Sequence, residues 1–324
     1  MGNKWRSRNH TVMTGFIILG FSNVQELQSL IGFLVLVIYL LNLMGNLTIL
    51  IIIHLDPHLH TPMYFFLGNL SILDMCYATD TLHKILDGFL TGDKFISFHA
   101  CMVQMYFFTT FACSEFYLLS VMAYDRYVAI CNPLRYSLIM NKRVCILLAT
   151  VSWLISFSGS VPYPLMVSRL SFCKSNEINH FFCDLTALLK LSCSDTLPVE
   201  LTVLIESGIF GMSPFLLTLT SYVYIISAIL RIRSTEGRSK AFSTCSSHLT
   251  AVILFYGTVM CTYLRPASMY SLNRDKLLAL LYTAVIPMLN PLIYSLKNKQ
   301  VKDALKRVVN GKICSFCNAK AMIH

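Results

Sequence analysis

The chain has 324 residues, of which 55% are hydrophobic and 13% charged, and its formal net charge is +10 at pH 7. Soluble domains usually carry about 25% charged residues. This composition, with a mean hydropathy of +0.61, therefore excludes an ordinary soluble domain and indicates a multi-pass membrane protein. In such a protein the basic excess is first a topology signal and not a nucleic-acid footprint. The first fifteen residues are polar and no short apolar core with a cleavage site follows them, so we expect no cleavable signal peptide.

Seven apolar stretches are long enough to cross a bilayer, which takes about 20 mostly apolar residues per helix. They are Leu27–Ile53, Pro62–Leu82, Phe98–Ile130, Val144–Val161, Val199–Leu230, Phe242–Tyr263 and Leu277–Leu296. The second, which contains Asp74, and the seventh, which contains Pro287, Asn290 and Pro291, are predicted to be the weakest on hydropathy. The predicted fold is all-α. A bundle of seven transmembrane helices occupies residues 27–297, between a tail of residues 1–26 and a C-terminal segment of residues 298–324.

The distribution of basic residues predicts the orientation, because cytoplasmic loops carry an excess of Lys and Arg. One side of the predicted bundle holds 15 of the 26 basic residues and only four acids, whereas the other basic residues alternate with acids. We therefore expect the N-terminal tail to be outside the cell. A glycosylation sequon at Asn9 agrees with this orientation. Four cysteines fall on the predicted outer side, where disulfides persist, and by themselves allow three pairings: Cys101, Cys173, Cys183 and Cys193.

Three polar residues, Asp74, Glu115 and Asn290, fall near the middle of the second, third and seventh segments. Carboxyl groups buried in a membrane are costly, so we expect them to face one another, water or a cation. Together with Asn46 they form a candidate sodium site, and a neutral hydrogen-bonded cluster is the alternative. The two prolines of the seventh segment remove helix hydrogen bonds, which predicts a kink there.

The C-terminal segment has its own pattern. Residues 298–309 alternate basic and apolar residues at helical spacing, which predicts a short amphipathic helix on the inner membrane surface. Cys314 and Cys317 follow it. A single C-x-x-C is a weak indication of zinc, and palmitoylation is an equally simple interpretation. The charged pair Asp125–Arg126 at the end of the third segment favours a functional role, although a helix end that meets water would explain it as well.

The motifs together resemble those of rhodopsin-like G-protein-coupled receptors and, more narrowly, of vertebrate odorant receptors. They are Gly45-Asn46, Pro62–Leu67, Leu70–Asp74, Met122–Tyr136 (M-A-Y-D-R-Y-V-A-I-C-N-P-L-R-Y), Ser221-Tyr222, Lys240–Leu249 (K-A-F-S-T-C-S-S-H-L) and Pro287–Tyr294 (P-M-L-N-P-L-I-Y). A D-R-Y alone is a weak signal, but the blocks 122–136 and 240–249 together are highly specific to odorant receptors. The resemblance covers nearly the whole chain and implies a receptor, not an enzyme.

The resemblance also implies roles for individual residues. It pairs Cys101 with Cys183 and Cys173 with Cys193. It makes Asp125 the restraint on an arginine that is released toward a G protein on activation, where two tyrosines meet it. The switch residues implied are Asp125, Arg126, Tyr127, Tyr222 and Tyr294.

The predicted ligand pocket lies in the outer half of the bundle, from helix spacing and from the resemblance. Its residues are Gln104, Met105, Phe108, Thr109, Ala112 and Cys113 of the third helix, with Ser207, Phe210, Tyr256, Val259, Met260, Tyr263, Leu280 and Thr283 of later helices. Ordinary packing between helices is the alternative for each of them. Receptors for amines place an Asp where this chain has Phe108, so we expect an uncharged or weakly polar ligand, although Glu206 in the fifth segment would still attract a cation.

The predicted function is an odorant receptor for small volatile or hydrophobic molecules that activates a stimulatory, olfactory-type G protein and raises cyclic AMP. The resemblance places it in the plasma membrane of olfactory neuron cilia, in contact with lipid, with no nucleic-acid partner and no cofactor other than the candidate sodium ion. A sensor of metabolites in another tissue is the main alternative. A transporter would predict an internal repeat, which the sequence lacks. A membrane enzyme would need a nucleophile–base pair in the bundle, where His248 stands alone.

Overall fold

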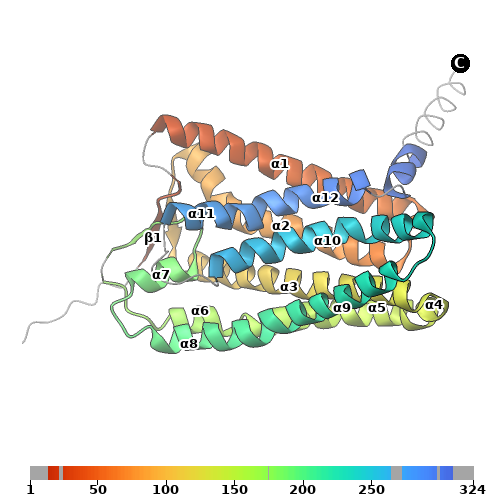
Figure 1. The fold of residues 1–324 in the computed structure, drawn as a ribbon. Coiled ribbons are helices and arrows are strands. Elements are labelled where there is room, and N and C mark those ends of the chain that lie inside the picture. The colour runs from red at the N-terminus through yellow and green to blue at the C-terminus, as the bar shows by residue number, and fades with distance from the viewer. Residues whose placement is uncertain (1–13, 22–24, 174, 264–271, 298–299, 309–324) are drawn as a thin grey trace, which may run out of the picture.

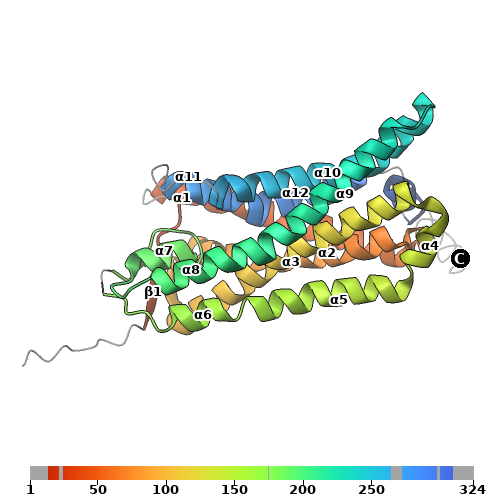
Figure 2. The same cartoon turned by 60° about the horizontal axis from the view of Figure 1, so that its bottom comes forward.

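The computed structural model describes residues 14–21, 25–173, 175–263, 272–297 and 300–308. Long helices run side by side along one direction in both views of the ribbon (Figures 1 and 2). In this described part of the chain, seven helical spans match the seven predicted stretches. They are α1 (Gln25–Leu55), α2 (Pro62–Thr91), α3 (Phe98–Cys131), α5 (Lys142–Gly159), α8 with α9 (Leu197–Glu206, Met212–Leu230), α10 (Thr235–Tyr263) and α11 with α12 (Leu272–Leu280, Ile286–Lys297). The all-α bundle is confirmed.

Shorter elements interrupt or connect these spans. Two π-helical turns, η3 (Ser207–Gly211) and η5 (Leu281–Val285), join α8 to α9 and α11 to α12. The connections contain η1 (Pro57–Leu59), η2 (Pro133–Arg135), α4 (Tyr136–Ile139), α6 (Pro162–Val167) and α7 (Leu185–Leu191). Neither π-helical turn was predicted from the sequence, because a regular 3.6-residue pattern does not reveal one inserted residue.

By length and composition alone, five helices among the described residues are apolar enough to cross a membrane. They are Leu27–Leu55, Phe98–Cys131, Lys142–Val167, Leu197–Leu230 and Arg274–Tyr294. The second span, α2, is not among them, which confirms its predicted weakness. The seventh span is among the five, so the prediction that it is weak on hydropathy was wrong. The other weak span is the sixth, where only Cys245–Cys261 is apolar, because α10 begins with a polar turn and a half.

Local chemistry explains where several helices begin and end. The Ser97 hydroxyl accepts a hydrogen bond from the Ala100 amide at 3.2 Å and caps α3, and the Asn141 side chain caps α5 in the same way. Pro62 begins α2, where its missing N–H costs nothing. The same helix ends at Gly92, whose φ of 79° is a left-handed conformation that favours glycine.

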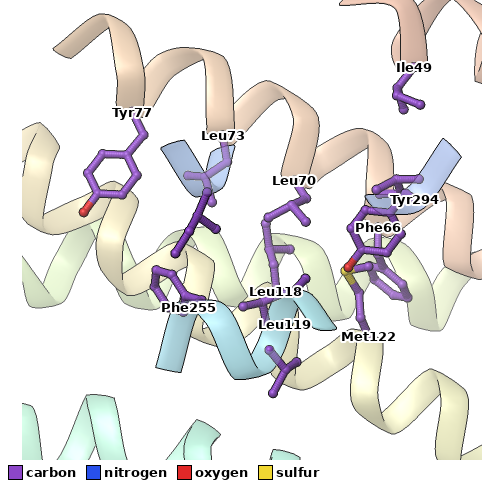
Figure 3. Close-up of a cluster of buried hydrophobic side chains, with 14 of the residues drawn as sticks. Ile49, Phe66, Leu70, Leu73, Tyr77, Leu118, Leu119, Met122, Phe255 and Tyr294 are labelled. Carbon is purple, nitrogen blue, oxygen red and sulfur yellow. The ribbon is translucent and has the colours of Figure 1, made fainter. Parts of the chain in front are cut away.

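The side chains are arranged for a membrane. On α1, Met44 is 66% exposed, whereas the polar Asn46 two residues later is 1% exposed. An apolar outer face with polar groups turned inward is what lipid requires. The interior holds one large apolar cluster, in which Leu70 points toward Leu118 and the rings of Phe66 and Tyr294 lie near Met122 (Figure 3).

A small three-stranded sheet covers one end of the bundle, and the sequence did not predict it. Strand β1 (Gly15–Ile18) lies between β2 (Phe95–Ser97), to which it is antiparallel, and β3 (Glu177–Ile178), to which it is parallel. A side chain at Gly15 would collide with the Ile96 carbonyl oxygen, so this position needs glycine. The Phe16 ring is fully buried. We call this end of the bundle the sheet end, and the end of α3 that carries Asp125 the Asp125 end.

A helix over residues 300–308 confirms the predicted amphipathic helix within the described part. The Arg307 guanidinium donates to Asp56, with Nη2 and Oδ2 2.7 Å apart, and the Tyr64 hydroxyl donates to Gln300 at 2.7 Å. These contacts hold the helix against η1 and the start of α2. Burial alone would raise the pKa of Asp56, but hydrogen bonds from Arg307 and His58 outweigh it and lower the pKa to about 2. The predicted sites at Asn9, Cys314 and Cys317 lie outside the described residues.

Candidate functional site

Two disulfides fix the loop between α6 and α8 at the sheet end. Cys101 bonds to Cys183 and Cys173 bonds to Cys193, which confirms the pairing that the resemblance implied. The first bond anchors the loop to the start of α3. Gln104, one turn further along α3, adds to this anchor, because its Oε1 accepts from the Cys183 amide at 2.9 Å and its Nε2 donates to the Asp80 carbonyl at 2.7 Å. Gln104 therefore joins the loop to α2 through the two ends of its amide.

The anchored loop places the ring of Phe182 against the ring of Phe108 in α3. The Phe182 and Phe108 ring centroids are 4.5 Å apart. Tyr77 of α2 and Tyr282 of η5 approach the same ring of Phe108, at 5.6 and 6.4 Å. The sequence identified Phe108 but missed its three partners. The pair of aromatic residues directly before Cys183 was the only local signal, because a disulfide draws its neighbours toward α3.

Tyr256 of α10 contacts two neighbouring helices, α3 and α9. Its hydroxyl donates to the Phe116 carbonyl of α3 at 3.3 Å and lies 3.5 Å from the Thr218 hydroxyl of α9. The rings of Phe116 and Phe215 both lie 5.2 Å from its own ring. A ligand that displaced the Tyr256 ring would disturb α3, α9 and α10 at once.

The other predicted pocket residues have different surroundings. Met105 belongs to the apolar cluster beneath the sheet, and Ala112, Val259 and Leu280 pack at the edge of the main core. The hydroxyls of Thr109 and Thr283 donate to carbonyls of their own helices. Met260 is half-buried and Cys113 is partly exposed, while the Tyr263 side chain lies outside the described residues.

The π-helical turn η3 determines where the fifth-span residues point. Ser207 is exposed, and Phe210 is directed at α5, since a side chain added at Gly159 would meet its ring at 3.7 Å. A second π-helical turn, η5, carries Thr283 and Tyr282. Such turns often occur at functional sites. Here both lie in the half of the bundle toward the sheet end, where the ligand pocket was predicted.

The predicted polar cluster is assembled in the middle of the bundle. Asn290 Nδ2 donates to Asp74 Oδ2 at 2.9 Å, and Glu115, 1% exposed, is close enough to interact with the charge of Asp74. Among the described residues no hydrogen bond reaches either oxygen of Glu115, the second oxygen of Asp74, or the amide oxygens of Asn46 and Asn290. Five buried oxygens without donors match the hard oxygen ligands that a small cation prefers, so the residues present fit a cation.

The first and seventh spans are in contact at Gly45 and Asn46 of α1. Pro291 lies inside α12 and cannot donate to the carbonyl of Pro287 four residues earlier. Asn46 Nδ2 donates to that carbonyl at 3.2 Å and so replaces the lost helix bond. Gly45 allows this approach, because a side chain there would already lie 3.1 Å from the Pro291 ring.

At the Asp125 end, Arg126 is held by its neighbour. Arg126 Nε donates to Asp125 Oδ2 at 3.0 Å and its Nη2 contacts the same oxygen. The Tyr136 hydroxyl of α4 donates to the other oxygen, Oδ1, at 2.7 Å. Burial and the neighbouring Asp125 charge raise the pKa of the Tyr136 hydroxyl, so it stays a donor. The ion pair implied by the resemblance is present, and Tyr136 supports it.

Among the described residues, no hydrogen bond joins Arg126 to either of the two switch tyrosines, Tyr222 and Tyr294. The Tyr222 hydroxyl lies 2.7 Å from Nδ1 of His248 in α10, and the two rings are stacked. The Tyr294 hydroxyl is buried and has no hydrogen-bond partner among the described residues. Tyr127 packs against Tyr224, with ring centroids 5.8 Å apart. His248 does not stand alone, as its sequence position suggested, because α9 and α10 bring Tyr222 to it.

The comparisons with known proteins now identify the family. The family model described as Olfactory receptor matches residues 35–312. The chain belongs to the olfactory receptor family. It is 50% identical over 306 residues to Olfactory receptor 1M1 of Mus musculus, covering 94% of this chain and 98% of that protein. It is 46% identical over 312 residues to Olfactory receptor 5I1 of Homo sapiens, covering 96% and 99%. The crystal structure of squid rhodopsin, 15% identical, has a TM-score of 0.68 over 90% of this chain and 88% of that chain, which shows the shared fold.

Olfactory receptors are G-protein-coupled receptors and not enzymes, so this chain is a membrane receptor for small molecules that couples to a G protein. In this receptor Asp125 is bonded both to Arg126 and to Tyr136, which was not among the predicted switch residues. Tyr222 is paired with His248 and not with Arg126. The Asp125 end is therefore in a restrained arrangement.

Proposed function

We propose that this olfactory receptor takes a small, uncharged and mainly apolar odorant in the half of the bundle toward the sheet end. The proposal is carried by the surroundings of Phe108, where rings from α2, from the disulfide-anchored loop and from η5 converge. Pockets for small ligands are mostly apolar with a few polar groups. A cationic amine would find no carboxylate at this position, which favours an uncharged ligand.

Signalling would follow from a shift between two populations. An agonist must bind the activated form more tightly than the restrained one, otherwise the equilibrium does not change. The proposed route runs from the ligand through Tyr256 and the Asp74–Glu115 cluster to Arg126. Release of Arg126 from Asp125 would open this end to a stimulatory, olfactory-type G protein and raise cyclic AMP.

The test is a cyclic-AMP reporter screen of chemically diverse volatiles in cells that express the receptor. Phe108→Ala and Tyr256→Ala should both weaken the response, with surface expression measured in parallel, because each removes a ring at the centre of the predicted pocket. Unchanged dose–response curves in both variants would exclude this site. Expression of the transcript in olfactory neurons or in another tissue distinguishes an odorant receptor from a sensor of metabolites elsewhere.

We also propose that the sheet end faces the outside of the plasma membrane. Both disulfides lie there, as an oxidising environment requires, and most basic residues fall at the other end by sequence. An epitope tag at the N-terminus should stain intact cells. Staining only after permeabilisation would reverse the orientation.

A sodium ion in the middle cluster is a further part of the proposal. The buried oxygens of Asp74, Glu115 and Asn290 that lack donors support it. Such an ion would neutralise carboxylates in the restrained form and lower the response to agonist. Replacing sodium by choline should shift the dose–response curve of the receptor, and Asp74→Asn should abolish the shift. A shift that persists in Asp74→Asn would locate the ion effect elsewhere.

A further inference from the structure

Glu206 is an acid inside a membrane span, and one of its carboxyl oxygens is buried without a hydrogen bond to the described part of the chain. It is the last residue of α8, directly before η3, and lies within the span Leu197–Leu230. Its Oε2 atom is buried and makes no hydrogen bond to any described residue. Acids within membrane spans are costly and usually mark a binding or transport function.

The acid nearest to Glu206 on the same helix shows the contrast. Glu200 lies in the first turn of α8, is exposed, and accepts a hydrogen bond from the Thr196 hydroxyl at 2.7 Å. Its carboxyl group is an ordinary one at a helix end, where it is hydrated and favoured by the helix dipole. Glu206 has neither water exposure at Oε2 nor a donor.

The Glu206 carboxyl group is directed into the bundle. It interacts electrostatically with the thiol of Cys113 in the outer half of α3. Cys113 in turn lies near Ser156 of α5. Phe210, one turn after Glu206, lies against Gly159 of α5. The carboxyl group therefore faces the region between α3, α5 and α8, beside Cys113 and Phe210 of the predicted pocket.

A second acid in the outer half does not share this position. Asp80 of α2 also has a buried oxygen without a hydrogen bond to the described residues. However, Asp80 interacts electrostatically with Cys76, which lies one turn away on the same helix. The carboxyl group of Glu206, in contrast, interacts electrostatically with a residue of another helix, Cys113 of α3.

We propose that Glu206 accepts a hydrogen bond from the polar end of the ligand, so that the receptor selects odorants with an O–H or N–H donor on an apolar body. This inference rests on the proposed odorant-receptor function. A carboxyl group accepts hydrogen bonds in both its ionised and its protonated form. A ligand donor would satisfy the buried oxygen, whereas an ether oxygen offers it only lone pairs. The two candidate ligand classes, neutral alcohols and protonated amines, share a hydrogen-bond donor that this oxygen can accept.

The test uses straight-chain alcohols, primary amines, aldehydes and methyl ethers of matched chain length, after a broad odorant screen. Cyclic AMP is measured against concentration, with surface labelling of each variant. Alcohols or amines should activate the wild-type receptor, with aldehydes and ethers at least about tenfold weaker, the range expected for one hydrogen bond to a charged or buried group. Glu206→Leu should remove this preference. Glu200→Leu, which deletes an exposed acid from the same helix, should leave it intact.

A second variant separates the two kinds of donor, and Glu206→Met takes the place of Glu206→Leu if that variant does not reach the surface. Glu206→Gln keeps an acceptor oxygen of nearly the same shape but never carries a charge. Loss of amine responses in this variant identifies a cationic ligand, and retained alcohol responses identify a neutral one. Active ligands that all lack a donor, or a donor preference that survives the apolar replacement Glu206→Leu or Glu206→Met, would overturn the assignment and leave the receptor function standing. A surface-expressed receptor silent to the whole broad screen would instead contradict the proposed function.

Discussion

Replacing Tyr136 by Phe should raise the signal of the receptor in the absence of ligand. The change removes one hydroxyl and keeps the ring. In the restrained arrangement that hydroxyl donates to Asp125 Oδ1 at 2.7 Å, while Arg126 occupies Oδ2. Asp125 is fully buried, so no water readily replaces the lost donor. Asp125 would hold Arg126 as before, but the restrained form would lose one of its bonds.

The size of the expected increase in basal signal follows from the strength of the hydrogen bond that Tyr136→Phe removes. A hydrogen bond to a charged group contributes about 1.5–3 kcal/mol. Tyr136 is only partly buried, so solvent screening reduces this contribution to about 1.4 kcal/mol, which is a factor of about ten in the equilibrium constant. If the activated form is about 1% populated without ligand, it should rise to about 9%. The ligand-independent signal would then increase by nearly an order of magnitude.

The assay is basal cyclic AMP normalised to surface receptor. Tyr127→Phe is the matched control, because its hydroxyl makes no hydrogen bond to Asp125 in the described part of the chain and its ring packs against Tyr224. Asp125→Asn should raise the basal signal as well. Adding Tyr136→Phe to it should bring little more, because both changes weaken the bonds of the same side chain at position 125 and are therefore coupled. An unchanged or lower basal signal in Tyr136→Phe, at equal surface level, would refute the restraint, as would full additivity with Asp125→Asn.

Three further predictions concern other contacts. His248→Phe should raise basal cyclic AMP about two- to tenfold, since it frees Tyr222 from a neutral hydrogen bond of about 0.5–1.5 kcal/mol; an unchanged basal signal would contradict this. Lys276→Met should lower the thermal midpoint of the purified receptor by an amount that corresponds to about 1–3 kcal/mol, because the Gly20 carbonyl and the Asn179 side-chain oxygen lose the ammonium that lies 2.6 Å from each; Lys190→Met is the exposed control. Burial, with the nearby lysine charges, lowers the pKa of His180 from 6.5 to about 4, so the folded loop keeps it neutral. Its contribution to stability is complete above pH 6.5 and is lost as pH falls toward 4. Over that interval the protection of residues 176–183 against hydrogen exchange, relative to the intrinsic exchange rate at each pH, should fall in wild type but not in His180→Phe.

The seven spans were predictable because they depend on local composition. Each span repeats one physical requirement, apolar side chains over the thickness of a bilayer, and needs no knowledge of its neighbours. The pair Asp125–Arg126 was predictable for a similar reason, since the two residues are adjacent in sequence. The disulfides were different. Four cysteines on one side allowed three pairings, and only the resemblance selected the pairs that the structure contains.

The contacts that sequence reasoning missed join segments far apart in the chain. Strand β1 pairs with residues 95–97 and 177–178, and no strand pattern of useful length exists in any of the three segments. Tyr222 and His248 meet only because α9 and α10 pack together. Gln104 was assigned to the ligand from its place on α3, yet both ends of its amide bind backbone of other segments. Spacing along one helix predicts which residues share a face, but not which partner that face will meet.

The distribution of unpaired polar atoms suggests how a ligand can control a distant switch. At the Asp125 end the carboxylate is fully bonded, by Arg126 and Tyr136. In the middle and outer parts, buried oxygens of Asp74, Glu115 and Glu206 have no donors among the described residues. Buried polar groups without partners destabilise the form that contains them. A ligand or cation that supplies the missing partner therefore contributes binding energy in the outer and middle parts. If it does so more strongly in the activated form, that difference can offset the loss of the Asp125 bonds.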